Sequence, residues 1–164
     1  MKKELRAVLA ALLVTAAAAA VIIWSSGREE VISDRPPDLT IAFGEEECLA
    51  WRGGFQWEWP DGLTTQAVIA DAPHPLDVQD DLPALNAAPG DTLVLAFGGV
   101  PDKVEVMYCQ ADASALTAQT TFWQLSAGNQ LVLPEDCAGT VWVIDAKWET
   151  SAATGRAQYA FSIS

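Results

Sequence analysis

The sequence predicts an all-β domain, an antiparallel sandwich, that follows an N-terminal apolar helix. Three observations predict it: an uncharged apolar run at residues 7–24, apolar residues at every second position in four later segments, and Gly, Pro and Asp between those segments. The 164 residues suffice for one domain and one terminal segment.

The N-terminal segment, residues 1–24, has the features of a membrane helix. Lys2, Lys3 and Arg6 precede a run without a charge. As a helix this run would span roughly 27 Å, close to the thickness of a bilayer core. Basic residues favour the cytoplasmic side of a membrane, so the rest of the chain is expected to lie outside. These features predict a single-pass signal anchor in the cell membrane.

A cleaved signal peptide is the alternative. Ala18 and Ala20 are small residues of the kind that precede a cleavage site. Against cleavage, the apolar run continues to Trp24, and tryptophan is typical of the membrane interface. If the segment is cleaved, the protein is expected to be secreted.

Residues 25–38 are predicted to form a linker, and residues 39–164 an extracytoplasmic domain. The linker is polar, and it contains Gly27 and the pair Pro36-Pro37.

Four segments of the domain show the alternation of a β-strand most clearly. Within each, residues such as Val, Ile, Tyr, Phe and Trp share one face. The segments are residues 92–97, 104–109, 141–148 and 157–164. Their periodicity places Trp142, Trp148, Tyr159 and Phe161 in the core.

Earlier segments carry weaker strand patterns, at residues 39–43, 66–70 and 130–133. Residues 48–52 and 55–59 flank Gly53-Gly54, which predicts a hairpin with a tight turn at the two glycines. No helix is expected in the domain beyond a turn near residues 111–117. About eight short strands separated by such turns predict an immunoglobulin-like β-sandwich.

The charge of the chain excludes nucleic-acid binding. Nine Lys and Arg against 22 Asp and Glu give a net charge of −13, which repels a phosphate backbone.

The only histidine, His74, stands between two prolines, and no G-x-S-x-G motif occurs. We therefore expect no enzyme activity, no cofactor and no resident metal.

The carboxylate groups of the chain suggest two alternative functions, a glycoside hydrolase and a calcium-binding domain. Glu58 lies between Trp57 and Trp59, and a glycoside hydrolase needs two carboxyl groups about 5–10 Å apart in such an aromatic setting. Four aspartates occur between residues 71 and 81, and Ca²⁺ is bound by oxygen ligands. Both patterns also suit solvated turn residues.

The three cysteines leave their pairing open. Thiols outside the membrane tend to pair, and a Cys109–Cys137 disulfide would join the end of one strand to the loop before another. A bridge from either residue to Cys48, or three reduced thiols, are the alternatives.

Trp51 and Trp123 lie outside the clearest alternation, so they are the tryptophans of the domain that could be exposed. An exposed aromatic side chain can stack on a sugar ring or anchor a protein partner. These two tryptophans are the candidate ligand-stacking residues.

Several segments of the domain also carry a resemblance. GGFQWEWPDG (53–62), DAPHPLDVQDDLP (71–83) and PGDTLVLAF (89–97) precede a final strand pair with VIDAKW (143–148) and YAF (159–161). Together they resemble uncharacterised small membrane-anchored or secreted β-sandwich proteins of gut Firmicutes. The resemblance implies a fold and a location, and it carries over no catalytic or binding residues.

The function expected from the sequence is that of a non-enzymatic, membrane-anchored extracytoplasmic module that contacts an envelope protein or a glycan. A carbohydrate-binding or calcium-binding sandwich is one alternative, and a carboxylate-based glycoside hydrolase is another. The sequence leaves the oligomeric state open.

Overall fold

The computed structural model describes residues 34–115, 118–126 and 128–164, and these residues form an all-β sandwich. The prediction of an antiparallel β-sandwich is thereby confirmed. The predicted membrane or signal helix lies outside the described residues. Within the described ranges, no helix is long and apolar enough to span a membrane.

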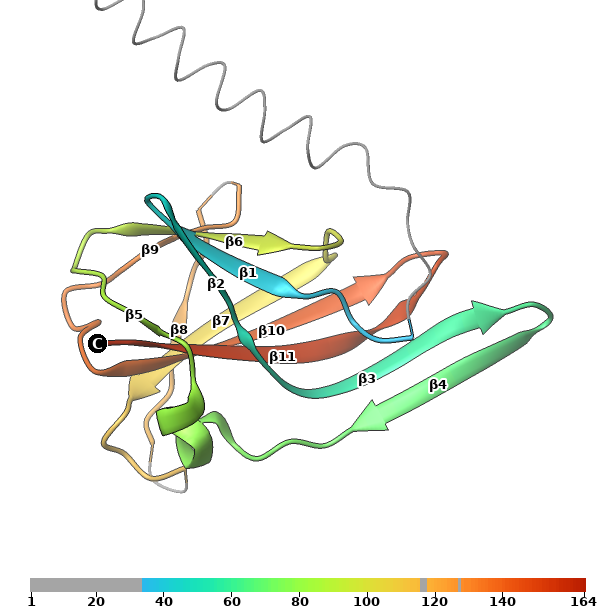
Figure 1. Cartoon of the computed structure of the whole chain (residues 1–164), viewed down its shortest axis with the longest axis horizontal. Helices are drawn as coiled ribbons and strands as arrows, with labels where there is room; N and C mark the ends of the chain where they lie inside the picture. Colours follow the sequence, from blue (N-terminus) through green and yellow to red (C-terminus); the bar gives the residue numbers. More distant parts are fainter. Residues whose placement is uncertain (1–33, 116–117, 127) are drawn as a thin grey trace, which may run out of the picture. The chain divides into compact units, whose positions relative to one another are not determined.

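Two sheets make up the sandwich (Figure 1). The small sheet has the strand order β2 (Glu46–Leu49), β1 (Leu39–Phe43), β6 (Thr92–Phe97) and β9 (Gln130–Val132). The large sheet has the order β4 (Thr64–Ala70), β3 (Trp51–Asp61), β11 (Thr154–Ile163), β10 (Thr140–Glu149), β7 (Lys103–Gln110) and β8 (Thr121–Trp123). Neighbours in these orders are antiparallel, and the short β5 (Ala84–Leu85) adds to β11 in parallel.

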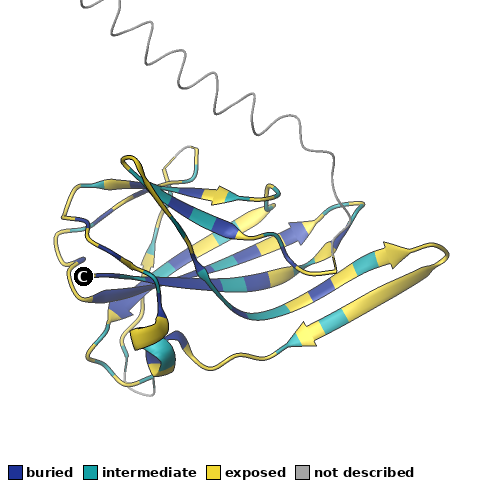
Figure 2. Ribbon diagram, in the orientation of Figure 1, coloured by how far each residue is buried: buried dark blue, intermediate teal, exposed yellow. Residues whose placement is uncertain are grey.

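The core lies between the sheets and follows the predicted alternation. Trp142, Tyr159 and Phe161 are fully buried. The Trp142 ring stacks between Tyr108, at a centroid distance of 4.6 Å, and Phe161, at 6.1 Å. Figure 2 shows the burial concentrated along β10 and β11, at the centre of the large sheet.

A second apolar cluster covers part of the outer face of the large sheet. Leu76 in the 3₁₀ helix η1 (Pro75–Asp81) and Leu82 just after it pack with Val141, Val143 and Ala160. The His74 ring Nδ1 accepts a hydrogen bond from the Leu76 N–H at 3.2 Å, which caps the helix. No helix was predicted here, because residues 71–83 were interpreted as acidic turns.

The predicted hairpin turn at Gly53-Gly54 is wrong. Both glycines lie inside the continuous strand β3, where they form a bulge opposite Gln158 between two pairs of the β3–β11 ladder. A methyl group at Gly53 would lie 2.9 Å from the Trp51 ring, and one at Gly54 would lie 3.2 Å from the Ala70 carbonyl oxygen. The two glycines are therefore required by close packing within the strand and not by a turn.

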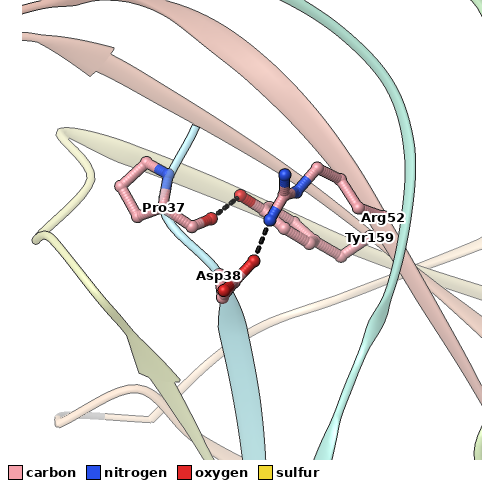
Figure 3. Close-up of polar contacts among 4 residues, drawn as sticks. All are labelled: Pro37, Asp38, Arg52 and Tyr159. Atoms are coloured by element: carbon pink, nitrogen blue, oxygen red, sulfur yellow. Dashed lines mark hydrogen bonds and ion pairs between the residues drawn. The ribbon is translucent and has the colours of Figure 1, made fainter. Parts of the chain in front are cut away.

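The residues that lead into β1 are fixed to the large sheet (Figure 3). The Tyr159 hydroxyl donates to the Pro37 carbonyl oxygen, and the Arg52 guanidinium pairs with the Asp38 carboxylate. Pro36 is buried. The packed domain thus extends back into the last residues of the predicted linker.

Candidate functional site

The hairpin of β3 and β4, here called the arm, is the part of the domain most open to a partner. The last pair between β3 and β11 is Glu58 with Thr154, so residues 59–66 extend beyond the neighbouring strand (Figure 1). The turn between β3 and β4 has Gly62 at φ 62°, as the first central position of a type II′ turn requires. Leu63, in the turn, is fully exposed, and 71% of Ile69 is exposed.

Local hydrogen bonds fix the turn of the arm. The Thr64 hydroxyl donates to the Asp61 carbonyl oxygen at 2.9 Å, and the Gln66 amide donates to the Asp61 carboxylate at 3.3 Å. The exposed apolar side chains therefore stand on an ordered hairpin and not on a loose loop.

β4 is the terminal strand of the large sheet, and half of its backbone polar groups face outward. A two-residue turn makes Asp61–Thr64 a hydrogen-bonded pair, and such pairs alternate along an antiparallel ladder. The N–H and C=O groups of Thr65, Ala67 and Ile69 therefore point away from β3. Among the described residues, no strand pairs with this edge of β4.

A polar hollow lies at the base of the arm, on the outer face of the large sheet. Its volume is about 420 Å³, and Asp71, Asp145, Arg156, Gln56 and Gln158 line it. The Gln158 amide donates to Asp145 at 3.4 Å, while Glu105 lies directly across the ladder from Asp145. Burial raises the pKa of Asp145, and the charge of Glu105 raises it further.

The two candidate stacking tryptophans lie in different surroundings. Trp51 is half-buried on the outer face, where it packs against the cluster around η1 and lies over Gly53 beside Gln158. Trp123 donates its indole N–H to the Val132 carbonyl oxygen at 2.9 Å and packs edge-on against Tyr108. Trp123 thus joins β8 of one sheet to β9 of the other, whereas Trp51 lies near Gln158, one of the residues that line the polar hollow.

The structure does not bring the cysteines together. All three are free thiols. Cys137 lies in the core between the sheets, and Cys109 lies in the cluster on the outer face, so the large sheet separates the two residues considered for a disulfide. Burial raises the pKa of all three thiols, which keeps them in the unreactive protonated form.

The carboxylates that suggested a hydrolase or a calcium site are dispersed. Glu58 is exposed on the outer face, whereas Trp57 is buried in the core, edge-on to Trp148 at 5.5 Å. In the described ranges, no three His, Cys, Asp or Glu side chains are grouped so that they could hold a metal ion.

Comparisons of the chain with protein-family models, curated proteins and solved structures found no match.

The arm could not be identified as a site from the sequence. Residues 66–70 were predicted as a strand, but their pattern does not show that this strand ends a sheet. The available signal was the turn Asp61-Gly62 together with an uncharged stretch after it, in a chain rich in acidic residues.

Proposed function

We propose that this protein is a non-enzymatic, membrane-anchored extracytoplasmic interaction module and that the arm is its contact region. The apolar N-terminal segment supplies the anchor and the outward orientation of the domain. The observation that carries the proposal is the exposure of Leu63 and Ile69 on an ordered hairpin that ends in an open strand edge. By analogy of fold, immunoglobulin-like sandwiches also bind through loops and edges outside the core.

The fixed entry of the chain into β1 suits a tethered module. Pro37 and Asp38 are the last residues of the predicted linker, and both are bonded to strands of the large sheet (Figure 3). Force on the tether would therefore reach β3 and β11 rather than unravel β1 alone.

Site-specific photo-crosslinking in the producing cells tests this function. A benzophenone amino acid replaces Leu63 in the full chain, and the matched control places it at Phe122, an exposed residue of the other terminal strand of the large sheet. We expect a discrete covalent adduct from position 63 and none from position 122. Equal labelling at both positions, or none at position 63, would contradict a contact region on the arm.

Carbohydrate binding is a second candidate, because Trp51 lies near Gln158, which lines the polar hollow. Carboxylate, amide and guanidinium groups next to an aromatic ring can bind the hydroxyl groups and the apolar face of a sugar. Titration of cell-wall glycans should then change the tryptophan emission of the wild type but not that of a Trp51→Phe variant. An identical response of both proteins removes this candidate.

A further inference from the structure

The four terminal strands of the two sheets differ in how they are protected. Natural proteins protect such edges with short strands, charges, prolines or bulges. In the described sheets β8 and β9 have three residues each, and β2 has four, of which two are glutamates. β4 has seven residues, without a charge, a proline or a register shift.

The open edge offers a template for one more strand. The backbone groups of Thr65, Ala67 and Ile69 alternate donor and acceptor along the edge, which is what an added strand requires. The side chains of the same residues are exposed, and the register with β3 places them on the outer face, opposite the face that carries the buried Trp57. A bound strand could therefore lay small or apolar side chains beside Ala67 and Ile69.

The charges around this edge select the partner. Asp61 and Asp71 lie at the two ends of β4, and Glu58 lies on β3 opposite Ala67. Arg52, at the base of the arm, is paired with Asp38, and Arg156 lines the polar hollow together with Asp71 and Asp145, so acidic groups outnumber basic ones around the edge. The potential along the edge is therefore negative, and it favours a segment with basic ends.

The same charges oppose pairing of two copies of the chain. A two-fold antiparallel pairing centred on Ala67 would place Asp71 of one copy opposite Leu63 of the other, two residues from Asp61. Asp71 of one copy and Asp61 of the other would then lie near the same end of the new ladder, and the mutual repulsion of these acidic groups disfavours the pairing. The domains themselves are also acidic, with 19 Asp and Glu against five Lys and Arg after residue 33.

We infer that the outer edge of β4 binds an extended segment of a partner protein, with small or apolar residues at its centre and Lys or Arg at both ends, as an added β-strand. This inference rests on the proposed function, and it specifies how the arm makes its contact. Backbone hydrogen bonds supply the affinity, and the acidic flanks supply the selectivity.

Fluorescence anisotropy with labelled synthetic peptides tests the inference on the full chain in detergent. The probe is the peptide Lys-Lys-Val-Thr-Val-Thr-Val-Lys-Lys, compared with the same peptide carrying Glu at its ends. A third peptide has the Lys ends and N-methyl groups at alternate residues, which block one edge of its backbone. We expect the Lys peptide to bind at least about tenfold more tightly than either of the others at low salt.

A protein variant tests the position of the bound strand. Ala67→Pro removes an N–H that faces the open edge and leaves the pairs with β3 intact. It should weaken binding by about tenfold, since one hydrogen bond is lost and a peptide carbonyl is left without a donor. Leu49→Ser, a control at an exposed residue of β2 in the other sheet, should bind like the wild type. If Ala67→Pro does not fold, the N-methylated peptide provides the same test from the ligand side.

Each outcome has one meaning. Preference for the Lys peptide, lost with Ala67→Pro or N-methylation, supports the inference. Equal binding of the Lys and Glu peptides overturns the selectivity, and equal binding of the N-methylated peptide overturns strand addition. A wild-type dimer in native mass spectrometry that Ala67→Pro abolishes assigns the edge to a second copy and overturns the inference. Absence of peptide binding together with crosslinks from position 63 overturns only the strand addition, whereas absence of both overturns the proposed function as well.

Discussion

The centre of the large sheet and its arm have the same strand pattern and opposite surroundings. β10 and β11 are covered on one face by the small sheet and on part of the other face by η1. Several of their side chains are at least nine-tenths buried. β3 and β4 continue the same sheet beyond this cover, with an exposed outer strand (Figure 2). The packing that stabilises the domain is therefore concentrated at the centre of the large sheet. The arm can make contacts with a partner without loss of this packing.

The largest contrast is expected from truncating one apolar side chain in each region. Trp142→Ala removes a fully buried ring stacked on Tyr108 and Phe161, and it should lower the free energy of unfolding by about 3–5 kcal/mol. Leu63→Ala removes a fully exposed side chain and should change that free energy by less than about 0.5 kcal/mol. Urea denaturation measures both. Similar losses in the two variants would refute the division between centre and arm.

A smaller contrast is expected from adding methyl groups. A Cβ at Gly155 would lie 2.3 Å from the Gln56 carbonyl oxygen and 2.6 Å from the Trp57 ring, so Gly155→Ala must push β11 away from β3. The expected loss is about 2–3 kcal/mol. Ala67→Val adds more volume on the exposed edge and should stay within about 0.5 kcal/mol of the wild type. Thermal unfolding of the two variants would show whether an added side chain is excluded between β3 and β11 and tolerated at the outer edge of β4.

The smallest contrast is electrostatic and depends on pH. Burial raises the pKa of Asp145, Glu105 adds to this effect, and the Gln158 amide and Arg156 oppose it. Because a raised carboxyl pKa means that ionisation disfavours the folded state, the native domain pays a penalty at neutral pH that disappears in acid. Asp145→Asn should therefore raise the melting temperature slightly at neutral pH, and the gain should vanish below about pH 4.

The matched control for that measurement is Glu58→Gln on the arm, where the carboxylate is exposed. At neutral pH its melting temperature should stay close to that of the wild type, because a substitution at an exposed position changes stability little. A gain from Asp145→Asn that persists in acid would show that the effect is not one of charge.

The sequence predicted the centre of the sandwich well because alternation reports which residues share a face. In β10 and β11 the inward faces were identified correctly, from Trp142 to Phe161. The predicted strands at residues 141–148 and 157–164 leave eight residues between them, but in the structure β10 runs to Glu149 and β11 already begins at Thr154. Gly155 explains the error, since a glycine is typical of a loop but here allows β3 to approach.

The arm was harder to predict because its features depend on distant pairing. Gly53-Gly54 suits either a turn or a bulge, and only the ladder with β11 decides between them. The cover on the outer face was also missed, because Val143 and Ala160 stand on the face that alternation assigns to solvent. Likewise, no local pattern shows that Trp123 bonds to a strand of the other sheet.

Residue-resolved amide hydrogen exchange of the full chain tests the open edge most directly. Within β4, the amides of Thr65, Ala67 and Ile69 should exchange rapidly, whereas those of Gln66, Val68 and Ala70 should be slower by at least about tenfold, because they face β3. Slow exchange of all six amides in the isolated protein would mean that the edge is already covered. That result would contradict the account of the arm as the contact region of the module.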